Sequence, residues 1–364
     1  MGKRFSFRAM WGGPVKALVR RSFAAGDMVL ADVPEPSPGP GMVKIRVEYA
    51  GICSSDVGVL KMELTPAFKR LRPPVVAGHE GVGTVVEVGP GVSRVRMGDR
   101  VVSETTLVAC GVCRYCRSGY SNKCIDRRSL GWSANGYYAE YLIANELYCH
   151  KIADAVDSRA AALLEPFSCT VKAVMHESVL QPGDVALVFG PGPIGQCLAQ
   201  VAKLLGAYVV VVGTCHSRAR LELARQLGAD EVWMTPDEDV VERIRDLTRG
   251  YGADAVYDCV GSQASLSTGL QCVRPKGQFV FVSGNKQPLQ IDCFHILVDE
   301  IRITAAEGGS PLSWEKAVDL VNRRLVNLAP LVSDIFPLAR WTEAFAQVDR
   351  REGLKVLLQP QSEG

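Results

Sequence analysis

The stretch VALVFGPGPIGQCLAQVAK, residues 185–203, decides the fold of this chain. It reads as a buried strand, a glycine-rich turn of the form G-x-G-x-x-G, and the start of a helix. The first glycine permits a tight bend, the second lets the backbone approach a pyrophosphate, and the third lets the helix pack on the strand. A purely structural turn is the alternative, but the strand before it and the helix after it favour a dinucleotide-phosphate site at the helix N-terminus. The residues expected there are Gly190, Gly192, Pro193, Ile194 and Gly195.

Working outward from this turn, six short apolar runs alternate with helical stretches. The runs are VALVFG, VVVVG, EVWM, DAVYDCVG, QFVFVSG and IRITA. This alternation predicts an α/β domain with a doubly wound parallel sheet covered on both faces. Upstream, to about Leu147, the period-two runs GMVKIRVEYAG and GVGTVVEVG predict a β-rich domain. The tail after AAEGGS has two helical patterns and a closing strand, LKVLLQP, and is expected to return to the β-rich domain.

The composition excludes several function classes. The chain has 364 residues, enough for two domains, and its 41 Lys+Arg nearly balance its 39 Asp+Glu, so no nucleic-acid partner is expected. No apolar run reaches the length needed to span a membrane; VVVV at Val209–Val212, for example, is far too short and is expected to be a buried strand. The basic opening MGKRFSFRAMWGGPVKALVRR, residues 1–21, lacks an apolar signal core and is expected to be a short solvated extension. Most of the twelve cysteines stand alone, which favours a reducing compartment, the cytoplasm.

The loop after the second parallel strand bears on the choice of cofactor. An acid about 20 residues beyond the glycine turn would hold the ribose 2′-hydroxyl of NAD. The stretch GTCHSRARL, residues 213–221, contains no acid, and its hydroxyl, imidazole and guanidinium groups would accept a 2′-phosphate instead. NADP is therefore expected in preference to NAD, the alternative being that both arginines are solvated charges. The residues expected at the 2′ position are Thr214, His216, Ser217, Arg218 and Arg220.

Four cysteines fall within fifteen residues of the stretch CGVCRYCRSGYSNKC. Cys110, Cys113, Cys116 and Cys124 have the spacing C-x2-C-x2-C-x7-C, which suits a closed tetrahedral zinc site. Redox disulfides and an iron–sulfur cluster are the alternatives; the first is disfavoured in a reducing compartment and the second usually has other spacings. Four thiolates leave no position open for a substrate, so this zinc is expected to be structural.

A second candidate set is scattered along the chain. Cys53, His79, Glu80 and Glu165 could be a core thiol, a turn histidine and two ordinary charges. If they converge, a thiolate, an imidazole and a carboxylate with one open position make up a catalytic zinc site. Sequence patterns alone leave these alternatives open.

The motifs GICSSD, GHEGVGTVVEVGPGV, GDRVV, the four-cysteine lobe, the glycine turn, GADAVYDCVG and RPKGQFVFVSG occur here in order. In this the chain resembles the zinc-dependent medium-chain dehydrogenases, the alcohol and sorbitol dehydrogenase superfamily. The resemblance implies a GroES-like catalytic domain at residues 1–172, with the zinc lobe near 105–128. It also implies a Rossmann domain at 173–308 and a return to the catalytic domain at 309–364.

The resemblance also implies roles for single residues. Cys53 and His79 match ligands of a catalytic zinc, and Glu165 matches the third ligand in sorbitol-dehydrogenase-like members, bound directly or through water. Glu80 matches a direct or exchanging ligand. Ser55 matches the hydroxyl that relays the substrate proton, and Asp56 matches the acid that orients the zinc histidine.

Two departures from the family pattern narrow the expected reaction. Gly58 stands where liver-type enzymes have a relay histidine, so the proton leaves by another route, such as water. The Arg–Tyr pair of sorbitol dehydrogenases is absent from ITAAEGGS, which argues against sorbitol but not against a related polyol or cyclitol. The expected enzyme oxidises a secondary alcohol to a ketone with a nicotinamide cofactor and two zinc ions, as a homodimer or homotetramer. The alternatives are a metal-independent enone or quinone reductase of the same fold and a non-catalytic nucleotide-binding protein.

Overall fold

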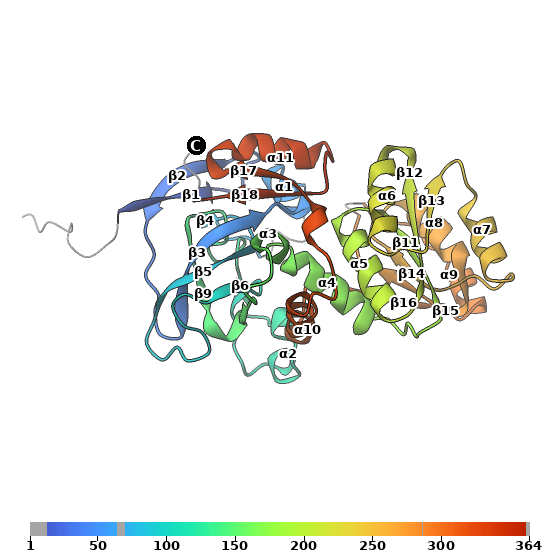
Figure 1. Cartoon of the computed structure of the whole chain (residues 1–364), viewed down its shortest axis with the longest axis horizontal. Coiled ribbons are helices and arrows are strands. Elements are labelled where there is room, and N and C mark those ends of the chain that lie inside the picture. Colours follow the sequence, from blue (N-terminus) through green and yellow to red (C-terminus); the bar gives the residue numbers. More distant parts are fainter. Residues whose placement is uncertain (1–12, 64–69, 286, 362–364) are drawn as a thin grey trace, which may run out of the picture. The chain divides into compact units, whose positions relative to one another are not determined.

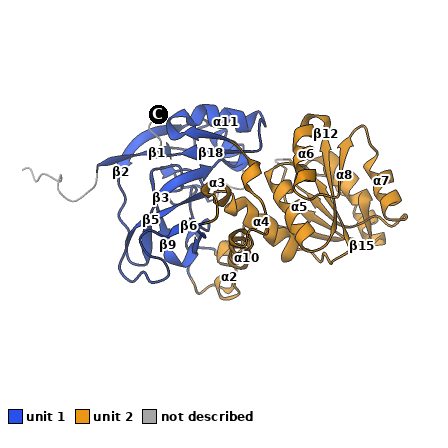
Figure 2. Ribbon diagram, in the orientation of Figure 1, with its two compact units in different colours: residues 1–110, 125–154, 334–364 blue, residues 111–124, 155–333 orange. Residues whose placement is uncertain are grey.

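The computed structural model describes residues 13–63, 70–285 and 287–361. The chain divides into two compact units, which Figure 2 colours separately. Unit 1 takes the described residues of 1–110, 125–154 and 334–364, and unit 2 takes residues 111–124 and the described residues of 155–333. Residues 1–12 of the expected N-terminal extension lie outside the described residues. The expectation was wrong for Pro14–Arg20, which form strand β1, because Val15, Ala17 and Leu18 are buried.

The sheet of unit 2 is built from the six predicted strands. All of its pairs are parallel and the spatial order is β13-β12-β11-β14-β15-β16. The order reverses at β11, and this reversal is where doubly wound folds bind their ligands. The predicted doubly wound α/β sheet is therefore confirmed. Its strands are β11 (Val185–Phe189), β12 (Tyr208–Thr214), β13 (Glu231–Thr235), β14 (Ala253–Asp258), β15 (Val273–Phe281) and β16 (Arg302–Ala305).

Helices follow the strands of unit 2 because the chain must return to start each parallel strand. Of these, α5 and α6 pack on β11–β13, and α8 packs on β14 and β15 (Figure 1). Strand β12 is apolar along most of its length and its valines are fully buried, as expected for a strand covered on both faces. The helices are α2 (Arg114–Arg117), α3 (Ser158–Ala161), α4 (Leu164–Met175), α5 (Pro193–Leu204), α6 (Arg218–Gln226), α7 (Val240–Leu247), α8 (Gln263–Cys272), α9 (Cys293–Val298) and α10 (Pro311–Asn322), with 3-10 turns η2 (Ser121–Lys123), η4 (Cys215–Ser217) and η5 (Ala329–Leu331).

Unit 2 is larger than the Rossmann segment expected from the sequence. Helix α4 packs against both α5 and α10, so residues 155–172 and 309–333 cluster with the parallel sheet. This division rests on packing alone, and the predicted domain boundaries at 172 and 308 stay a prediction.

Unit 1 is the predicted β-rich part. Its main sheet has the order β10-β6-β5-β3-β18-β17, with β9 also paired to β3, and smaller sheets join β2-β1-β4 and β7-β8. The strands are β1 (Pro14–Arg20), β2 (Met28–Pro34), β3 (Met42–Gly51), β4 (Val75–Val76), β5 (Glu80–Val88), β6 (Arg100–Ser103), β7 (Thr106–Val108), β8 (Arg128–Ser129), β9 (Tyr141–Asn145), β10 (Cys149–Lys151), β17 (Val332–Pro337) and β18 (Lys355–Gln359). The helical segments are α1 (Ser54–Leu60), η3 (Glu146–Tyr148), η6 (Leu338–Arg340) and α11 (Trp341–Asp349).

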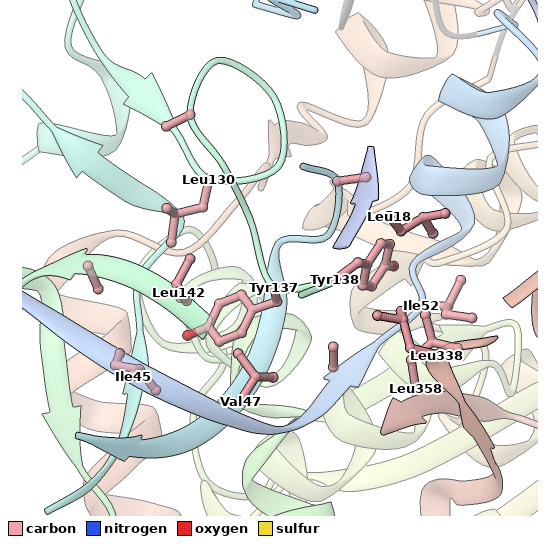
Figure 3. Packing of buried hydrophobic residues seen from close by; sticks show 14 of the residues in the cluster. Leu18, Ile45, Val47, Ile52, Leu130, Tyr137, Tyr138, Leu142, Leu338 and Leu358 are labelled. Carbon is pink, nitrogen blue, oxygen red and sulfur yellow. The ribbon is translucent and has the colours of Figure 1, made fainter. Parts of the chain in front are cut away.

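The closing strand β18 returns to this sheet, antiparallel to β3. Side chains from both ends of the chain therefore share one core, where Leu18, Tyr137, Tyr138 and Leu358 are buried together (Figure 3). On the other side of β3, strand β5 runs antiparallel with Gly51 opposite Glu80. This register decides which residues meet just beyond the strand ends. Among the described residues, no helix is both long and apolar enough to cross a membrane.

Candidate active site

The register of β3 and β5 brings three candidate metal ligands together in unit 1. Cys53 follows the end of β3, His79 precedes β5, and Glu80 is its first residue. One ligand atom from each, the Cys53 sulfur, a His79 ring nitrogen and a Glu80 carboxylate oxygen, lie within 4.8 Å of one another. His79 and Glu80 are buried and Cys53 is half-buried. Thiolate, imidazole and carboxylate are all zinc ligands, so the donor set fits that ion.

Asp56 orients the His79 ring. Its Oδ1 lies 3.2 Å from His79 Nδ1, so a protonated Nδ1 donates to the carboxylate and Nε2 keeps its lone pair for a metal. Its Oδ2 accepts the backbone N–H of Cys53 at 3.0 Å. Burial alone would raise the pKa of the Asp56 carboxyl, but His79 and these hydrogen bonds bring that pKa below its ordinary value. The contact predicted for Asp56 exists; its catalytic role stays a prediction.

Two residues that sequence reasoning missed contact Asp56 and Glu80. The Tyr138 hydroxyl lies 2.7 Å from Asp56 Oδ2, and the Lys355 ammonium from β18 forms an ion pair with the Glu80 carboxylate. Lys355 Nζ also donates to the carbonyl of Ile52 at 3.2 Å. Tyr138 lies in the stretch GYYAEY and Lys355 in LKVLLQP. Neither stretch has a recognisable metal-binding or catalytic motif, because these contacts depend on the long-range pairing of strands.

Glu80 supports the fit to a metal ion. Its side chain is fully buried, and apart from the ion pair with Lys355 neither carboxylate oxygen has a hydrogen-bond partner within the described part of the chain. A buried carboxylate without hydrogen bonds is costly unless a cation offsets it. Lys355 supplies one positive charge, and the neighbouring Cys53 and His79 ligand atoms suit a second cation.

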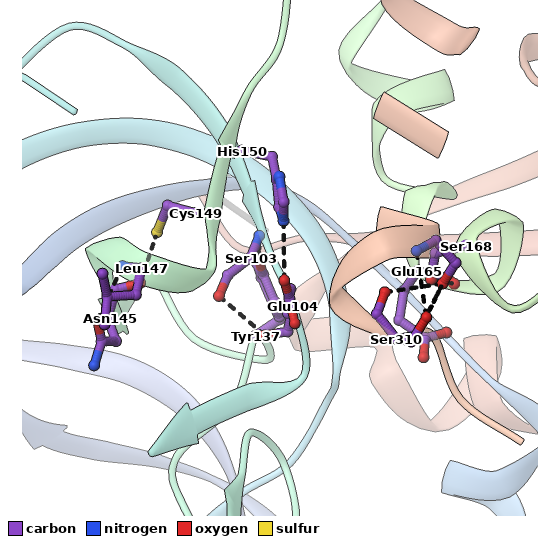
Figure 4. Close-up of polar contacts among 11 residues, drawn as sticks. Ser103, Glu104, Tyr137, Asn145, Leu147, Cys149, His150, Glu165, Ser168 and Ser310 are labelled. Carbon is purple, nitrogen blue, oxygen red and sulfur yellow. Dashed lines mark hydrogen bonds and ion pairs between the residues drawn. The ribbon is translucent and has the colours of Figure 1, made fainter. Parts of the chain in front are cut away.

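Ser55 and Glu165 lie on different elements. Ser55 is the second residue of α1 in unit 1, half-exposed, two residues from Cys53. Glu165 is in the first turn of α4 in unit 2, where its backbone carbonyl accepts the Ser168 hydroxyl at 2.7 Å (Figure 4). Zinc ligation by Glu165 and proton relay by Ser55 stay predictions.

The four-cysteine lobe forms a second candidate metal site. One sulfur each from Cys110, Cys113, Cys116 and Cys124 lie within 4.8 Å of one another. Cys113 caps α2, and its sulfur accepts the Cys116 backbone N–H at 3.5 Å. No disulfide joins any of the twelve cysteines, all of which lie in described stretches. Four thiols at this spacing match a closed, structural zinc shell.

Basic residues near the lobe are engaged inside the molecule. Lys123 forms an ion pair with Glu307. Arg127 donates to the hydroxyls of Thr105 and Thr106. These contacts tie the two side chains to neighbouring segments of the chain.

The glycine turn lies at the carboxyl end of β11, the central strand. Gly190 has a φ of +96°, which a side chain would strain, and a Cβ on Gly195 would lie 1.9 Å from the Gly190 carbonyl oxygen. Nothing lies within 4 Å of a Cβ position on Gly192, the N-cap of α5, and Pro193 and Ile194 begin that helix. The turn therefore keeps open space over a helix N-terminus, which suits a pyrophosphate.

The second loop follows β12. Thr214, His216 and Arg218 are exposed, and Arg220 is half-buried with its carbonyl accepting Gln196 Nε2 at 2.6 Å. The Ser217 hydroxyl accepts the Thr214 N–H at 2.9 Å and donates to the Thr214 carbonyl at 2.8 Å, so it closes the turn. Because they are exposed, the imidazole of His216 and the guanidinium of Arg218 could contact a phosphate group.

The chain matches two protein families and is similar to known dehydrogenases over nearly its whole length. Residues 39–154 match the family described as alcohol dehydrogenase GroES-like domain, and residues 193–323 match the zinc-binding dehydrogenase family. The chain is 38% identical to a sorbitol dehydrogenase of Halalkalibacterium halodurans, over 95% of this chain and 99% of the relative. It is 36% identical to the D-arabitol-phosphate dehydrogenase of Enterococcus avium, over 96% and 98%.

Solved structures share the fold over almost the whole chain. One, described as a zinc-binding dehydrogenase from Sinorhizobium meliloti 1021 bound to NADP, has a TM-score of 0.88 at 27% identity and covers 96% of this chain and 100% of its own. Another, described as a short chain alcohol dehydrogenase from Escherichia coli CFT073 complexed with NADH, has a TM-score of 0.85 at 25% identity, with coverage of 96% and 100%.

Proposed function

Because this chain belongs to the family of zinc-dependent medium-chain alcohol dehydrogenases, we propose that it oxidises a secondary alcohol of a polyol, sugar alcohol or cyclitol to a ketone, with NADP as hydride acceptor. Relatives named sorbitol dehydrogenase and D-arabitol-phosphate dehydrogenase support a polyol as the substrate. Similar solved structures described as bound to NADP and to NADH support a nicotinamide cofactor. The observation that carries the proposal is the convergence of Cys53, His79 and Glu80, with His79 oriented by Asp56.

Cys53, His79 and Glu165 would hold the catalytic zinc, with Glu80 as a further or exchanging ligand. When bound, zinc acts as a Lewis acid that lowers the pKa of the substrate hydroxyl. Asp56 would keep the proton of His79 on Nδ1, which would leave the lone pair of Nε2 available to a metal ion. The four-cysteine lobe would hold a second, structural zinc.

Residues of the chain would transfer the substrate proton and bind the cofactor. The Ser55 hydroxyl accepts the proton that leaves the substrate hydroxyl and passes it toward the cofactor ribose and water, since Gly58 offers no relay side chain. The glycine turn and the N-terminus of α5 bind the pyrophosphate and thereby fix where the nicotinamide receives hydride from the carbinol carbon.

The substrate class is tested by a screen of cofactor reduction at 340 nm with sugar alcohols, cyclitols and simple secondary alcohols. Turnover of a polyol by zinc-loaded protein supports the proposal. Metal-independent reduction of an enone or quinone would instead favour the reductase of the same fold. Cofactor binding without turnover of any substrate would favour a non-catalytic nucleotide-binding protein.

Arg218→Ala is expected to weaken NADP relative to NAD. The guanidinium is exposed at the start of α6, in a loop without acids, where it would form a charge-assisted hydrogen bond with the 2′-phosphate. Such a bond contributes about 1.5–3 kcal/mol, so KM for NADP should rise roughly tenfold or more while KM for NAD stays the same. Arg225→Ala, on the same helix beside Glu222, is the control. An equal change in KM for NADP and for NAD would mean that Arg218 is a solvated surface charge and does not bind the 2′-phosphate.

The surface of unit 2 supports self-association as a homodimer or homotetramer. Strand β16 is an edge of the parallel sheet, and Phe294, Leu297 and Val298 on α9 are largely exposed. An unpaired sheet edge and exposed apolar side chains each favour association. Sedimentation of the purified protein measures the assembly directly.

A further inference from the structure

The Tyr138 hydroxyl contacts Asp56, the carboxylate that orients His79, and the end of the strand that leads to Cys53. Its hydroxyl lies 2.7 Å from Asp56 Oδ2 and 3.0 Å from the carbonyl oxygen of Gly51, the last residue of β3. The other Asp56 oxygen, Oδ1, is the one that meets His79 Nδ1. Tyr138 is thus joined through a single carboxylate to a candidate zinc ligand.

The ring of Tyr138 is held firmly by its surroundings. The side chain is fully buried in the core of unit 1 and packs edge-on against Phe345, with ring centroids 5.9 Å apart (Figure 3). Gly78, the residue before His79, has a φ of +89°, and a Cβ there would lie 2.5 Å from the Tyr138 ring. The ring therefore packs directly on the backbone that carries His79, and its hydroxyl has little freedom to move.

We propose that Tyr138 is a positioning residue of the metal centre, which fixes the Asp56 carboxylate so that Asp56 presents His79 to the zinc. This inference rests on the proposed function, because it requires a metal at Cys53 and His79. Oδ2 is occupied by the Tyr138 hydroxyl and the Cys53 N–H, which leaves Oδ1 directed at the histidine. Without the Tyr138 hydroxyl, the Asp56 carboxylate loses one of its hydrogen-bond donors. It can then rotate more freely away from His79 Nδ1.

Burial and the neighbouring Asp56 carboxylate raise the pKa of the Tyr138 hydroxyl well above its usual value. The hydroxyl therefore remains a donor over the working pH range, as a fixed orienting group must.

The adjacent Tyr137 provides a matched control. It is equally buried in the same core, but its hydroxyl accepts the backbone N–H of Ser103 at 2.8 Å, and Ser103 is not one of the candidate ligands (Figure 4). Tyr138→Phe and Tyr137→Phe each remove one buried hydroxyl from neighbouring positions of the same chain. A general effect of losing such a hydroxyl would appear in both variants.

The experiment measures zinc affinity by competition with a chelator and the visible spectrum of Co²⁺-substituted protein. Subtracting the Cys53→Ala spectrum isolates the Cys53 site from the four-cysteine site. Loss of a group that orients a metal ligand typically lowers metal affinity 10–100-fold, and we expect about tenfold for Tyr138→Phe, since it acts through Asp56. The Co²⁺ bands should shift in Tyr138→Phe, whereas affinity and spectrum should be unchanged in Tyr137→Phe.

A double-mutant cycle with Asp56→Asn separates positioning from loss of stability. If Tyr138 acts through Asp56, Tyr138→Phe has little further effect on zinc affinity in the Asp56→Asn background. Equal zinc affinities and Co²⁺ spectra for the two tyrosine variants would overturn the proposal and leave the zinc dehydrogenase assignment standing. If Cys53→Ala binds as much metal as the wild type, the assignment of this zinc site fails, and the role of Tyr138 fails with it.

Discussion

Cys53→Ala is expected to abolish alcohol oxidation while leaving the fold intact. The thiolate is one of three ligand atoms gathered at the ends of β3 and β5, and its loss removes the site's sulfur ligand. A bound metal contributes several kcal/mol to stabilising charge on the reacting oxygen, and each 1.36 kcal/mol is tenfold in rate. The turnover number should therefore fall by about a thousandfold or more. Steady-state kinetics on an accepted polyol measures it.

Cys293→Ser is the matched control. This cysteine is exposed on α9 and belongs to neither metal-ligand group of the described residues, so its rate should match that of the wild type. Far-ultraviolet circular dichroism of both variants checks the fold. Near-normal turnover by Cys53→Ala would contradict the catalytic zinc and favour a metal-independent reductase.

Cys116→Ser is expected to lower the zinc content from two ions per chain to one and to loosen the lobe. Within residues 111–124, only Asn122 and Cys124 are buried, and the helical segments α2 and η2 are one turn each. So small a core cannot stabilise the segment without a metal, because ordering each backbone residue costs about 1–2 kcal/mol. Zinc binding to such sites contributes about 10–16 kcal/mol in small zinc peptides and offsets that cost.

Trypsin gives the readout, since the lobe contains Arg114, Arg117 and Lys123. Cleavage there should become fast in Cys116→Ser and remain slow in Cys293→Ser, and metal analysis should show the lost ion. Chelation of the wild-type protein should reproduce the new cleavage. An unchanged zinc content and an unchanged digest would mean that the lobe holds no structural metal.

Much of the fold follows from local pattern. The six parallel strands are predicted from mainly apolar runs of four to eight residues, because a strand buried on both faces is mostly apolar along its length. The glycine turn was located because Gly190 and Gly195 meet steric demands within six residues of each other. Strand β1 is not predicted, because its short stretch PVKALVR follows a basic polar opening and its apolar residues become buried only through pairing with β2 and β4.

The candidate site was only partly predictable. Cys53 and His79 were proposed as ligands by resemblance, and their meeting depends on the register that places Gly51 opposite Glu80. Tyr138 lies 82 residues from Asp56 along the chain, and Lys355 reaches Glu80 from the closing strand. No local spacing encodes such contacts, since each depends on how whole strands pair.

The position of Lys355 on β18 affects how the protein is made. During synthesis β3, β5 and their candidate ligands emerge early, but the cation that offsets Glu80 is in the last strand of the chain. Unit 2 is nearly complete by then, whereas unit 1 lacks its closing strand and a buried counter-charge. The nascent chain should therefore complete the charge balance of this metal centre only after β18 has been made, and a truncation before Lys355 should leave the nucleotide-binding sheet folded but the alcohol site incomplete.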